Sequence, residues 1–405
     1  MNIDRKLARI EVISNIIPID GADRIELAVI QGWQVVIAKK DNFKIGDKVV
    51  YFEIDSVLPQ QPLFEFMRDR KFRVKTIKLR KTISQGLVMP LSIIDNKYHN
   101  KEVGFDLTDI IGVKKFEPFV EKKAGQNNSI PSRLSPFPSY LFPKTDQERI
   151  QNCINIFDKY SNIDYNVVLT EKLHGESMSV YYNRGKFGVC SRNYELFNNN
   201  ILSKALMYIN KLKPINMLLT KLINSKYIDN KYKSLLKRLR SYNTNQSAFV
   251  GYSDSENLQE RISQYCKVNN VNYAFQGELV GVGHCGNYYK LDSEKWYVFD
   301  IYDIDKKKYL EFDAIKIICS DIGLYTVPLT NYARKQYISD NCYVGGKLSI
   351  DKLMLNIPKK SSIADVDCEG VVVNIEECST SYKMSYNYKI DSFKLINPQW
   401  LLRNE

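Results

Sequence analysis

Apolar and polar positions alternate along short segments of the N-terminal part of the chain, which is the pattern of half-buried β-strands. Ile25, Leu27 and Val29 fall on one face of such a strand, and a two-residue Gln-Gly turn follows. The chain then returns through a second alternating segment that starts at Trp33. Two alternating segments joined by a two-residue turn predict a β-hairpin.

The hairpin belongs to a longer series of segments that are rich in β-branched and aromatic residues. They cover residues 8–13, 24–30, 33–39, 48–54, 72–80 and 86–91. No long helical pattern separates them, so we expect five or six short strands that close into a small barrel. The OB-fold is a small barrel of this kind that binds nucleic acid. Residues 1–112 are therefore predicted to form an N-terminal OB-fold β-barrel domain.

A linker and a second domain are predicted after the barrel. Residues 113–143 collect Pro, Ser, Asn and Gly and lose periodicity, which is typical of a linker. Thr145 then has the features of a helix N-cap, with Glu148 three residues on. Apolar residues follow at helical spacing, namely Ile150, Cys153, Ile154 and Phe157. We expect this helix to open a second domain that covers residues 144–405.

Residues 197–247 are rich in Lys, Asn and Leu and differ from the strand-like segments around them. Their apolar residues recur every three or four positions, and Pro214 interrupts the pattern. We interpret this stretch as a helical insertion in a β-rich domain, with its basic residues on a solvated helix face. The fold class predicted for the whole chain is α+β.

Length and composition are those of a soluble protein with two domains. The 405 residues exceed one compact core of ordinary size. Hydrophobic residues make up 44% of the chain and charged residues 26%, and no apolar run is long enough to cross a bilayer. The N-terminus lacks an apolar segment with a cleavage site, which argues against a signal or transit peptide. We expect an intracellular, cytoplasmic protein that does not contact a membrane.

The eight cysteines are scattered, without a CxxC pair or a His/Cys grouping of the kind that binds zinc. His284 and Cys285 are neighbours, but they have no distant partners and fit local loop structure better than a metal site. Reduced thiols are predicted.

The charge balance favours a polyanionic partner. There are 58 basic and 46 acidic residues, which gives a net charge of +12. A composition that is rich in lysine throughout the chain is the other explanation, so charge alone does not identify a nucleic-acid surface.

The stretch TEKLHGESMSV, residues 170–180, places a lysine in a β pattern. The segments on either side look like consecutive strands, so Lys172 and Gly175 lie at a strand end or in the turn between them. Gly175 would let the backbone approach a ligand closely. A lysine that is desolvated or close to other cations has a lowered pKa and becomes a nucleophile.

Further blocks follow in order along the chain. Arg192 occurs in VCSRN, Glu278 in YAFQGELVG, Phe299 in WYVFDIYD, Glu369 in DCEGVVVNI, and Lys389 and Lys394 in YKIDSFKLIN. Together with the Lys172 block they resemble the six nucleotidyl motifs of the covalent nucleotidyltransferases, the superfamily of ATP-dependent DNA and RNA ligases and messenger RNA capping enzymes. Each block is weak by itself, but their ordered occurrence is specific.

The chain most resembles the ATP-dependent RNA ligases that carry an OB domain ahead of the nucleotidyltransferase domain. Four more stretches support this, namely GADRIEL (21–27), GDKVVYFEIDSVLP (46–59), KFRVKTIKLRKTISQGLVMPL (71–91) and FPKTDQERIQN (142–152). The resemblance covers most of the chain outside residues 197–247. It implies a C-terminal ligase adenylation domain, ATP-grasp-like, built of antiparallel sheets flanked by helices.

The resemblance also implies a reaction and a set of site residues. Lys172 attacks the α-phosphorus of ATP and expels pyrophosphate; AMP then passes to an RNA 5′-phosphate, and a 3′-OH displaces it. Glu278 and Glu369 suit a hard divalent cation, Mg²⁺ or Mn²⁺, which also helps to lower the lysine pKa. The expected nucleotide-binding residues are Glu171, Gly175, Arg192 and Phe299 on the nucleoside side and Arg149, Lys389 and Lys394 on the phosphate side.

Three positions leave alternatives open. Phe299 lies in an apolar run and fits a core position as well as adenine stacking. His174 stands where many relatives carry an aspartate that helps to hold metal-bound water, although another RNA ligase group has histidine there. Ser392 stands where a second lysine of the last motif would be, so Lys394 is a firmer assignment than Lys389.

We interpret the chain as a monomeric RNA ligase that joins 3′-OH and 5′-phosphate ends, with breaks in duplex RNA as its substrate by family analogy. A DNA ligase and a capping guanylyltransferase are the alternatives within the superfamily. They normally place an OB domain after the nucleotidyltransferase domain, whereas this chain ends about ten residues after Lys394. A non-catalytic RNA- or tRNA-binding protein is the alternative from another class, and it would need no lysine framed by carboxylates.

Overall fold

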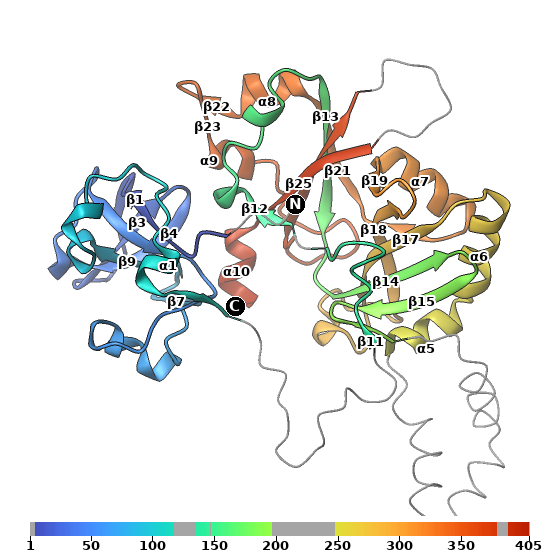
Figure 1. Ribbon diagram of the computed structural model, residues 1–405, viewed down its shortest axis with the longest axis horizontal. Helices are drawn as coiled ribbons and strands as arrows, with labels where there is room; N and C mark the ends of the chain where they lie inside the picture. Colours follow the sequence, from blue (N-terminus) through green and yellow to red (C-terminus); the bar gives the residue numbers. More distant parts are fainter. Residues whose placement is uncertain (1–4, 117–134, 146, 197–247, 379–387, 405) are drawn as a thin grey trace, which may run out of the picture.

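The computed structural model describes residues 5–116, 135–145, 147–196, 248–378 and 388–404 (Figure 1). Two parts are visible. The N-terminal part is a group of short strands, and the remainder is built around one long sheet with helices beside it. The structure confirms the predicted α+β class. The predicted helical insertion, residues 197–247, lies outside the described residues.

The N-terminal part has the OB-fold that the strand pattern predicted. Its strands are β1 (Ala8–Val12), β2 (Asn15–Pro18), β3 (Ile25–Ile30), β4 (Trp33–Ala38), β5 (Lys48–Phe52), β6 (Ser56–Val57), β7 (Thr76–Leu79), β8 (Thr82–Gln85), β9 (Leu87–Pro90) and β10 (Lys114–Lys115). They form the sheets β1-β5-β9, β2-β3-β4, β7-β8 and β6-β10. Short helices between them are η1 (Lys39–Asp41), η2 (Pro62–Arg70), η3 (Leu91–Ile93), η4 (Asn96–Tyr98) and α1 (Thr108–Ile111).

The predicted hairpin is present with the predicted turn. Ile30 pairs with Trp33, and the two turn residues between them, Gln31 and Gly32, have φ angles of 48° and 78°. Positive φ at both positions is the geometry of a type I′ turn, whose twist matches that of the flanking strands. The local sequence therefore determines this part of the fold.

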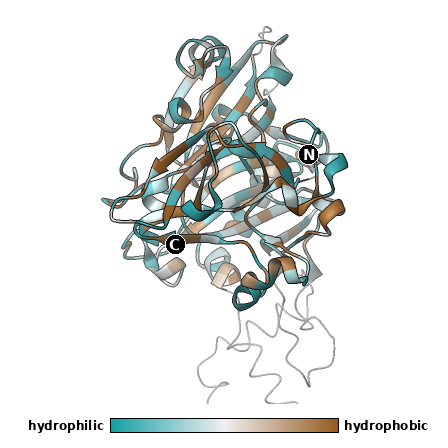
Figure 2. Cartoon of the chain, turned by 90° about the vertical axis from the view of Figure 1, so that its left-hand side faces the viewer, coloured by the Kyte–Doolittle hydropathy of each residue, from teal (hydrophilic) through white to brown (hydrophobic). Residues whose placement is uncertain are grey.

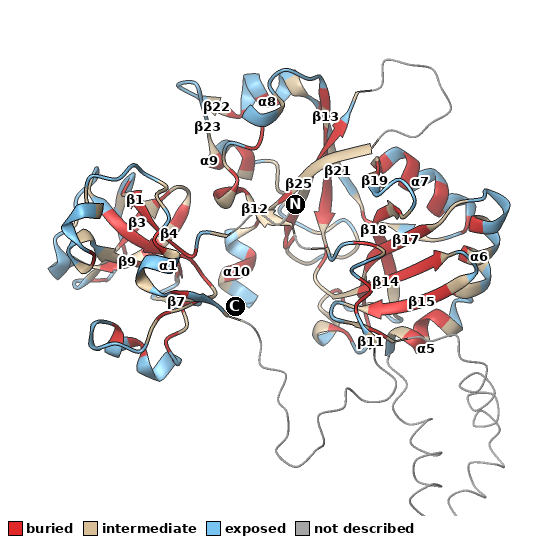
Figure 3. Ribbon diagram, viewed as in Figure 1, coloured by how far each residue is buried: buried red, intermediate tan, exposed pale blue. Residues whose placement is uncertain are grey.

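Strand β5 lies at the centre of the N-terminal part because both of its faces are buried. Val50 and Phe52 pack into one apolar cluster, whereas Val49 and Tyr51 pack into another. Successive side chains of a strand point to opposite faces, so one run of apolar residues serves two cores. Figure 3 shows buried positions concentrated in the strands and exposed positions in many of the connecting segments, and Figure 2 shows apolar residues along many of the same strands.

The second part is organised by a sheet of 13 strands. Its strands are β11 (Ser135–Pro136), β12 (Glu148–Arg149), β13 (Tyr165–Lys172), β14 (Glu176–Asn183), β15 (Lys186–Ser191), β16 (Tyr194–Glu195), β17 (Tyr273–Val280), β18 (Lys295–Asp303), β19 (Lys308–Leu310), β20 (Tyr325–Thr326), β21 (Leu329–Arg334), β24 (Gly370–Glu377) and β25 (Tyr388–Ile396). The main path runs β11-β16-β15-β14-β17-β18-β19-β25-β24-β13-β21.

Helices and one small hairpin complete the second part. They are η5 (Ile150–Asn152), η6 (Asp158–Tyr160), α5 (Ala248–Ser255), α6 (Leu258–Val268), η7 (Cys285–Asn287), α7 (Phe312–Asp321), α8 (Lys335–Asn341), β22 (Tyr343–Val344), β23 (Lys347–Leu348), α9 (Ile350–Met354) and α10 (Pro398–Asn404). Among the described residues no helix is both long and apolar enough to span a bilayer. All eight cysteines are free thiols, as predicted.

The consecutive strands β13 and β14 do not pair with each other. β13 lies between β24 and β21, whereas β14 lies between β15 and β17. The chain therefore crosses from one half of the sheet to the other within the three residues that follow Lys172. Each half has its own apolar core, with Met178 and Phe275 in one and Val167 and Phe393 in the other.

The prediction of a helix that begins at Thr145 is wrong. Residues 148–149 form the short strand β12, and only the single turns η5 and η6 follow. Ile150, Cys153 and Phe157 are nevertheless buried, as their spacing predicted. Parallel pairing of β12 with β25 fixes the start of the segment in an extended conformation, so tertiary contacts override its helical spacing.

Candidate active site

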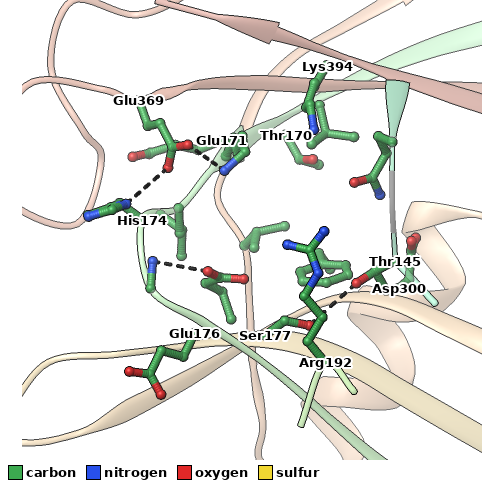
Figure 4. Close-up of a pocket in the computed structure, with 18 of the residues that line it drawn as sticks. Thr145, Thr170, Glu171, His174, Glu176, Ser177, Arg192, Asp300, Glu369 and Lys394 are labelled. Atoms are coloured by element: carbon green, nitrogen blue, oxygen red, sulfur yellow. Dashed lines mark hydrogen bonds and ion pairs between the residues drawn. The ribbon is translucent and has the colours of Figure 1, made fainter. Parts of the chain in front are cut away.

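A cavity of about 630 Å³ opens where the chain crosses from β13 to β14 (Figure 4). It lies between the two halves of the long sheet. The structure brings most of the predicted site residues to its wall, namely Glu171, Lys172, Gly175, Arg192, Glu278, Phe299, Glu369 and Lys394. Arg192 and Lys394 point into the space from opposite sides.

Lys172 is the last residue of β13, so its backbone is held by the sheet while its side chain is free to face the cavity. Its register partner is Gly370 of β24, the residue that follows Glu369. The Lys172 ammonium donates a hydrogen bond of 2.5 Å to Oε1 of Glu369. Pairing of the two strands therefore brings together side chains that are far apart in the sequence.

The expected lowering of the Lys172 pKa is contradicted. Burial by itself lowers the pKa, but the charges of Glu369 and Glu278 and the hydrogen bond to Glu369 outweigh burial. The pKa of Lys172 is raised above its ordinary value as a result. Two carboxylates that face one ammonium favour its charged form, so the lysine is an ion and not a free nucleophile in this arrangement.

Glu278 lies on β17 and faces the loop between β13 and β14. Its Oε1 accepts a hydrogen bond of 3.0 Å from the backbone N–H of Gly175. Burial raises the pKa of Glu278 to about 7, and Glu369 adds to the effect while Lys172 opposes it. Gly175 is required by this close approach, because a Cβ there would lie 2.5 Å from the backbone oxygen of Leu279.

Glu369 has an oxygen available for a cation. Its Oε2 is buried and accepts no hydrogen bond from the described residues. Nδ1 of His174 lies 3.7 Å from this oxygen, but burial lowers the pKa of that imidazole despite the attraction of Glu369. A buried carboxylate oxygen without a donor, beside the second carboxylate Glu278, fits a hard divalent cation such as Mg²⁺ or Mn²⁺.

Glu171 is fixed on the opposite side of β13 from Lys172. It is 1% exposed, and its Oε2 accepts a hydrogen bond of 2.8 Å from the backbone N–H of Ser362. Its Oε1 has no hydrogen-bond donor among the described residues, so it can accept one from a ligand. Phe299 lines the same cavity and also packs against the large apolar core, so its two predicted roles are compatible.

The two lysines predicted from the last motif lie in different surroundings. Lys394 lines the cavity, and its backbone pairs with Arg149 of β12. Lys389 forms an ion pair with Asp300 in which both side chains are only 5% exposed. Arg149 places its guanidinium over the Trp33 ring of the OB-fold domain, and its positive charge acts on Lys172. Neither Lys389 nor Arg149 is part of the cavity wall among the described residues.

Sequence reasoning missed the residues that hold the crossing loop. The hydroxyl of Tyr289 accepts a hydrogen bond of 2.7 Å from the backbone N–H of His174, and the Cys285 thiol donates to the carbonyl of Gly175 at 3.1 Å. Both come from the loop after β17. No local pattern marks them, because their partners are more than a hundred residues away in the chain.

Comparisons with known proteins agree with this architecture. A family model described as RNA ligase matches residues 165–396, and one described as an OB-fold domain matches residues 7–91. No curated protein sequence matches the chain.

Solved structures of the RNA ligase from Naegleria gruberi are similar over almost the whole chain. A mutant with ATP and Mn is 26% identical with a TM-score of 0.64, and 99% of each chain is covered. A mutant with AMP and Mn is 26% identical with a TM-score of 0.65, again with 99% of each chain covered. The enzyme with PPi is 27% identical with a TM-score of 0.62, and 98% of each chain is covered.

Proposed function

Since the chain belongs to the RNA ligase family, we propose that it joins RNA 3′-OH and 5′-phosphate ends through a covalent adenylate on Lys172. One observation carries this proposal: the Lys172 ammonium faces the carboxylates of Glu369 and Glu278 at the wall of a cavity large enough for a nucleotide. A site that only bound RNA would have no use for a half-buried lysine framed in this way.

In the first step the Lys172 amine forms a bond to the α-phosphorus of ATP, and the bond from that phosphorus to pyrophosphate breaks. The lysine must first lose a proton and its hydrogen bond to Glu369. A divalent cation, Mg²⁺ or Mn²⁺, held by Glu278 and Glu369 would supply positive charge that competes with the ammonium for these carboxylates. Positioning and charge neutralisation are the main requirements of phosphoryl transfer.

The remaining residues of the wall divide into two groups. Glu171 offers its unpaired Oε1 to the base, and Phe299 offers a ring for stacking. Lys394 and Arg192 face the cavity from opposite sides, so they can neutralise phosphate oxygens or hold the sugar. Arg149 pairs with Lys394 in the parallel β12–β25 pair, but its guanidinium lies over the Trp33 ring outside the cavity wall, so it would meet the pyrophosphate only after the pyrophosphate leaves the cavity.

In the second step the phosphorus of AMP leaves Lys172 for an oxygen of the RNA 5′-phosphate, which restores the free amine. In the third step the 3′-OH attacks the 5′-phosphorus, loses its proton and expels AMP.

We propose broken or nicked RNA as the substrate and RNA repair as the role. The OB-fold domain supports this, because it exposes basic residues for phosphate contact, namely Arg70, Lys71, Lys75, Arg80 and Lys81.

Sealing of a nicked RNA duplex with a labelled 5′-phosphate tests the function. With ATP and Mn²⁺ the full-length chain should convert the nick to a continuous strand, and Lys172→Ala should not. If the nick is supplied already adenylated, Lys172→Ala should seal it, because the first transfer is then bypassed. Failure of the wild-type chain on both substrates would overturn the proposal.

A further inference from the structure

The C-terminal helix α10 lies between the OB-fold domain and the second domain (Figure 1). Its buried residues Trp400 and Leu401 belong to the same apolar cluster as Ile83 of strand β8. Lys78 of strand β7 adds a hydrogen bond from its ammonium to the carbonyl oxygen of Leu402. The β7–β8 hairpin of the OB-fold domain is therefore attached directly to α10.

Trp400 also touches a residue at the cavity. Its ring centroid lies 5.0 Å from that of His174, with an angle of 64° between the planes. Tyr288 lies 5.5 Å from His174 and 6.2 Å from Trp400, nearly perpendicular to His174 at 88°. Edge-to-face contact from two sides restricts rotation of the imidazole ring.

The same helix holds the turn that carries Glu369. The backbone N–H of Asn397, just before α10, donates to the carbonyl oxygen of Glu369 at 2.8 Å. The Asn397 side-chain amide donates to the carbonyl oxygen of Cys368 at 2.9 Å. Tyr288 donates from its hydroxyl to the carbonyl oxygen of Asp367, also at 2.9 Å. The start of α10 therefore holds the backbone of Glu369, and the Trp400 ring of the same helix packs against His174.

We propose that Trp400 is a positioning residue that keeps His174 against Glu369 and links this pair to the docked β7–β8 hairpin. Trp400 is only 5% exposed and is absent from the described cavity wall, so it acts through His174. The inference rests on the proposed function, because the orientation of His174 matters to adenylate transfer only if the cavity performs that transfer.

The expected consequence is a change in the response to the divalent cation. The imidazole stands 3.7 Å from the one carboxylate oxygen that has no hydrogen bond from the described residues. Without Trp400 the ring can turn away, and the contact between His174 and this oxygen of Glu369 is lost. Loss of such an outer partner costs about 10- to 100-fold in metal affinity in other sites. We expect the Mn²⁺ concentration for half-maximal adenylate transfer to rise by about tenfold, with a smaller fall in the maximal rate.

Three variants of the full-length chain test this. Trp400→Leu removes the ring but keeps an apolar side chain, Trp400→Phe restores a ring, and Leu401→Ala disturbs the same helix without removing a contact to His174. Adenylate transfer is measured against Mn²⁺ concentration. The imidazole proton shifts of His174 are measured by NMR without nucleotide or metal, and the chain has only 3 histidines to assign.

Trp400→Leu should move the His174 signals and raise the Mn²⁺ requirement, and Trp400→Phe should return both toward wild type. Leu401→Ala, which opens the cluster shared with Ile83 but leaves the Trp400 ring against His174, should lower the melting temperature and change both readouts less than Trp400→Leu does. Ile83→Ala, in the OB-fold domain, should also move the His174 signals if the hairpin is linked to them.

Unchanged His174 signals in Trp400→Leu, or equal effects in Leu401→Ala, would overturn the positioning role. Unchanged signals in Ile83→Ala would overturn the link to the hairpin. If the wild-type chain accepted no adenylate, the proposed function would fail, but the NMR comparison would still decide whether Trp400 orients His174.

Discussion

Lys172 Nζ lies 2.5 Å from Oε1 of Glu369, and the two residues are held at this distance by neighbouring strands. The proposed nucleophile is thus paired with one of the proposed metal ligands. The pairing raises the pKa of Lys172 against the opposing effect of burial. A cation that occupies Glu369 would weaken the pairing, which explains why metal and lysine activation belong together in this site.

The rate of adenylate transfer should rise with pH. Below its raised pKa the fraction of neutral Lys172 grows about tenfold per pH unit, so the single-turnover rate should rise with the same slope. Ionisation of Glu278, whose pKa burial raises to about 7, should steepen the profile below that pH, because a cation binds the ionised carboxylate. The profile is measured by rapid quench at saturating ATP. A flat profile from about pH 6 to about pH 9 would contradict this account.

Lys394 and Lys389 should have separable effects. Lys394→Ala should slow adenylate transfer by about a hundredfold or more, because it removes a positive charge from the cavity wall, and the melting temperature should change little. Lys389→Ala should instead destabilise the fold by about 3–5 kcal/mol, because Asp300 is left buried without its ion-pair partner.

Transfer rates and urea unfolding of both lysine variants check these expectations. The double variant Lys389→Met with Asp300→Leu is the matched control, since it removes both charges and should recover much of the stability. Equal loss of rate in the two single variants, without loss of stability in Lys389→Ala, would show that Lys389 also serves the reaction.

The positions of these residues illustrate what the sequence can and cannot predict. The order of the motifs along the chain was enough to group Lys172, Glu278 and Glu369, because each lies in or next to a strand that its own local sequence indicates. The partner of Lys389 was not predictable, since Asp300 approaches it only after β18, β19 and β25 align in the sheet.

The same contrast holds for secondary structure. The hairpin whose first strand ends at Ile30 and whose second strand begins at Trp33 was predictable, because the residues that form its turn are adjacent in the sequence. The segment after Thr145 was not, because strand pairing between Arg149 and Lys394 overrides its helical spacing. Trp400 gave no signal either, since its contacts with Ile83 and His174 join three distant parts of the chain.

Stability should depend on the protonation of Glu376. This residue is 4% exposed and accepts the backbone N–H of Phe312 at 2.9 Å. Burial raises its pKa from 4.5 to about 7, so the folded state holds the proton more tightly than the unfolded state. Ionising Glu376 costs no folding free energy below the unfolded pKa of 4.5. The cost grows as the pH rises from 4.5 to about 7, and at higher pH it lowers the stability of the fold by about 3 kcal/mol.

Glu376→Gln should therefore stabilise the protein at pH 8, because the amide can accept the same hydrogen bond without carrying charge, and it should have little effect near pH 4. Thermal unfolding of both proteins across this range gives the test. A constant difference in melting temperature at all pH values would contradict the account.

RNA binding should depend on salt through the OB-fold domain. Arg80 and Lys81 are exposed at the turn of the β7–β8 hairpin, so Arg80→Gln with Lys81→Gln should weaken binding to a nicked RNA duplex. The slope of log affinity against log salt should fall by up to about 0.9 for each phosphate contact that is lost. Fluorescence anisotropy measures the slope, with exposed Lys267→Gln on α6 as the control. An identical slope in the hairpin variant would place the RNA elsewhere.

The most direct test of the central claim is the intact mass of the full-length protein after incubation with ATP and either Mg²⁺ or Mn²⁺. The account predicts that the wild type gains the mass of one adenylate and that Lys172→Ala gains none. Glu376→Gln is the control, since it lies outside the cavity wall and should be labelled like the wild type. An unlabelled wild type with both metals, or a labelled Lys172→Ala, would contradict the assignment of Lys172 as the nucleophile.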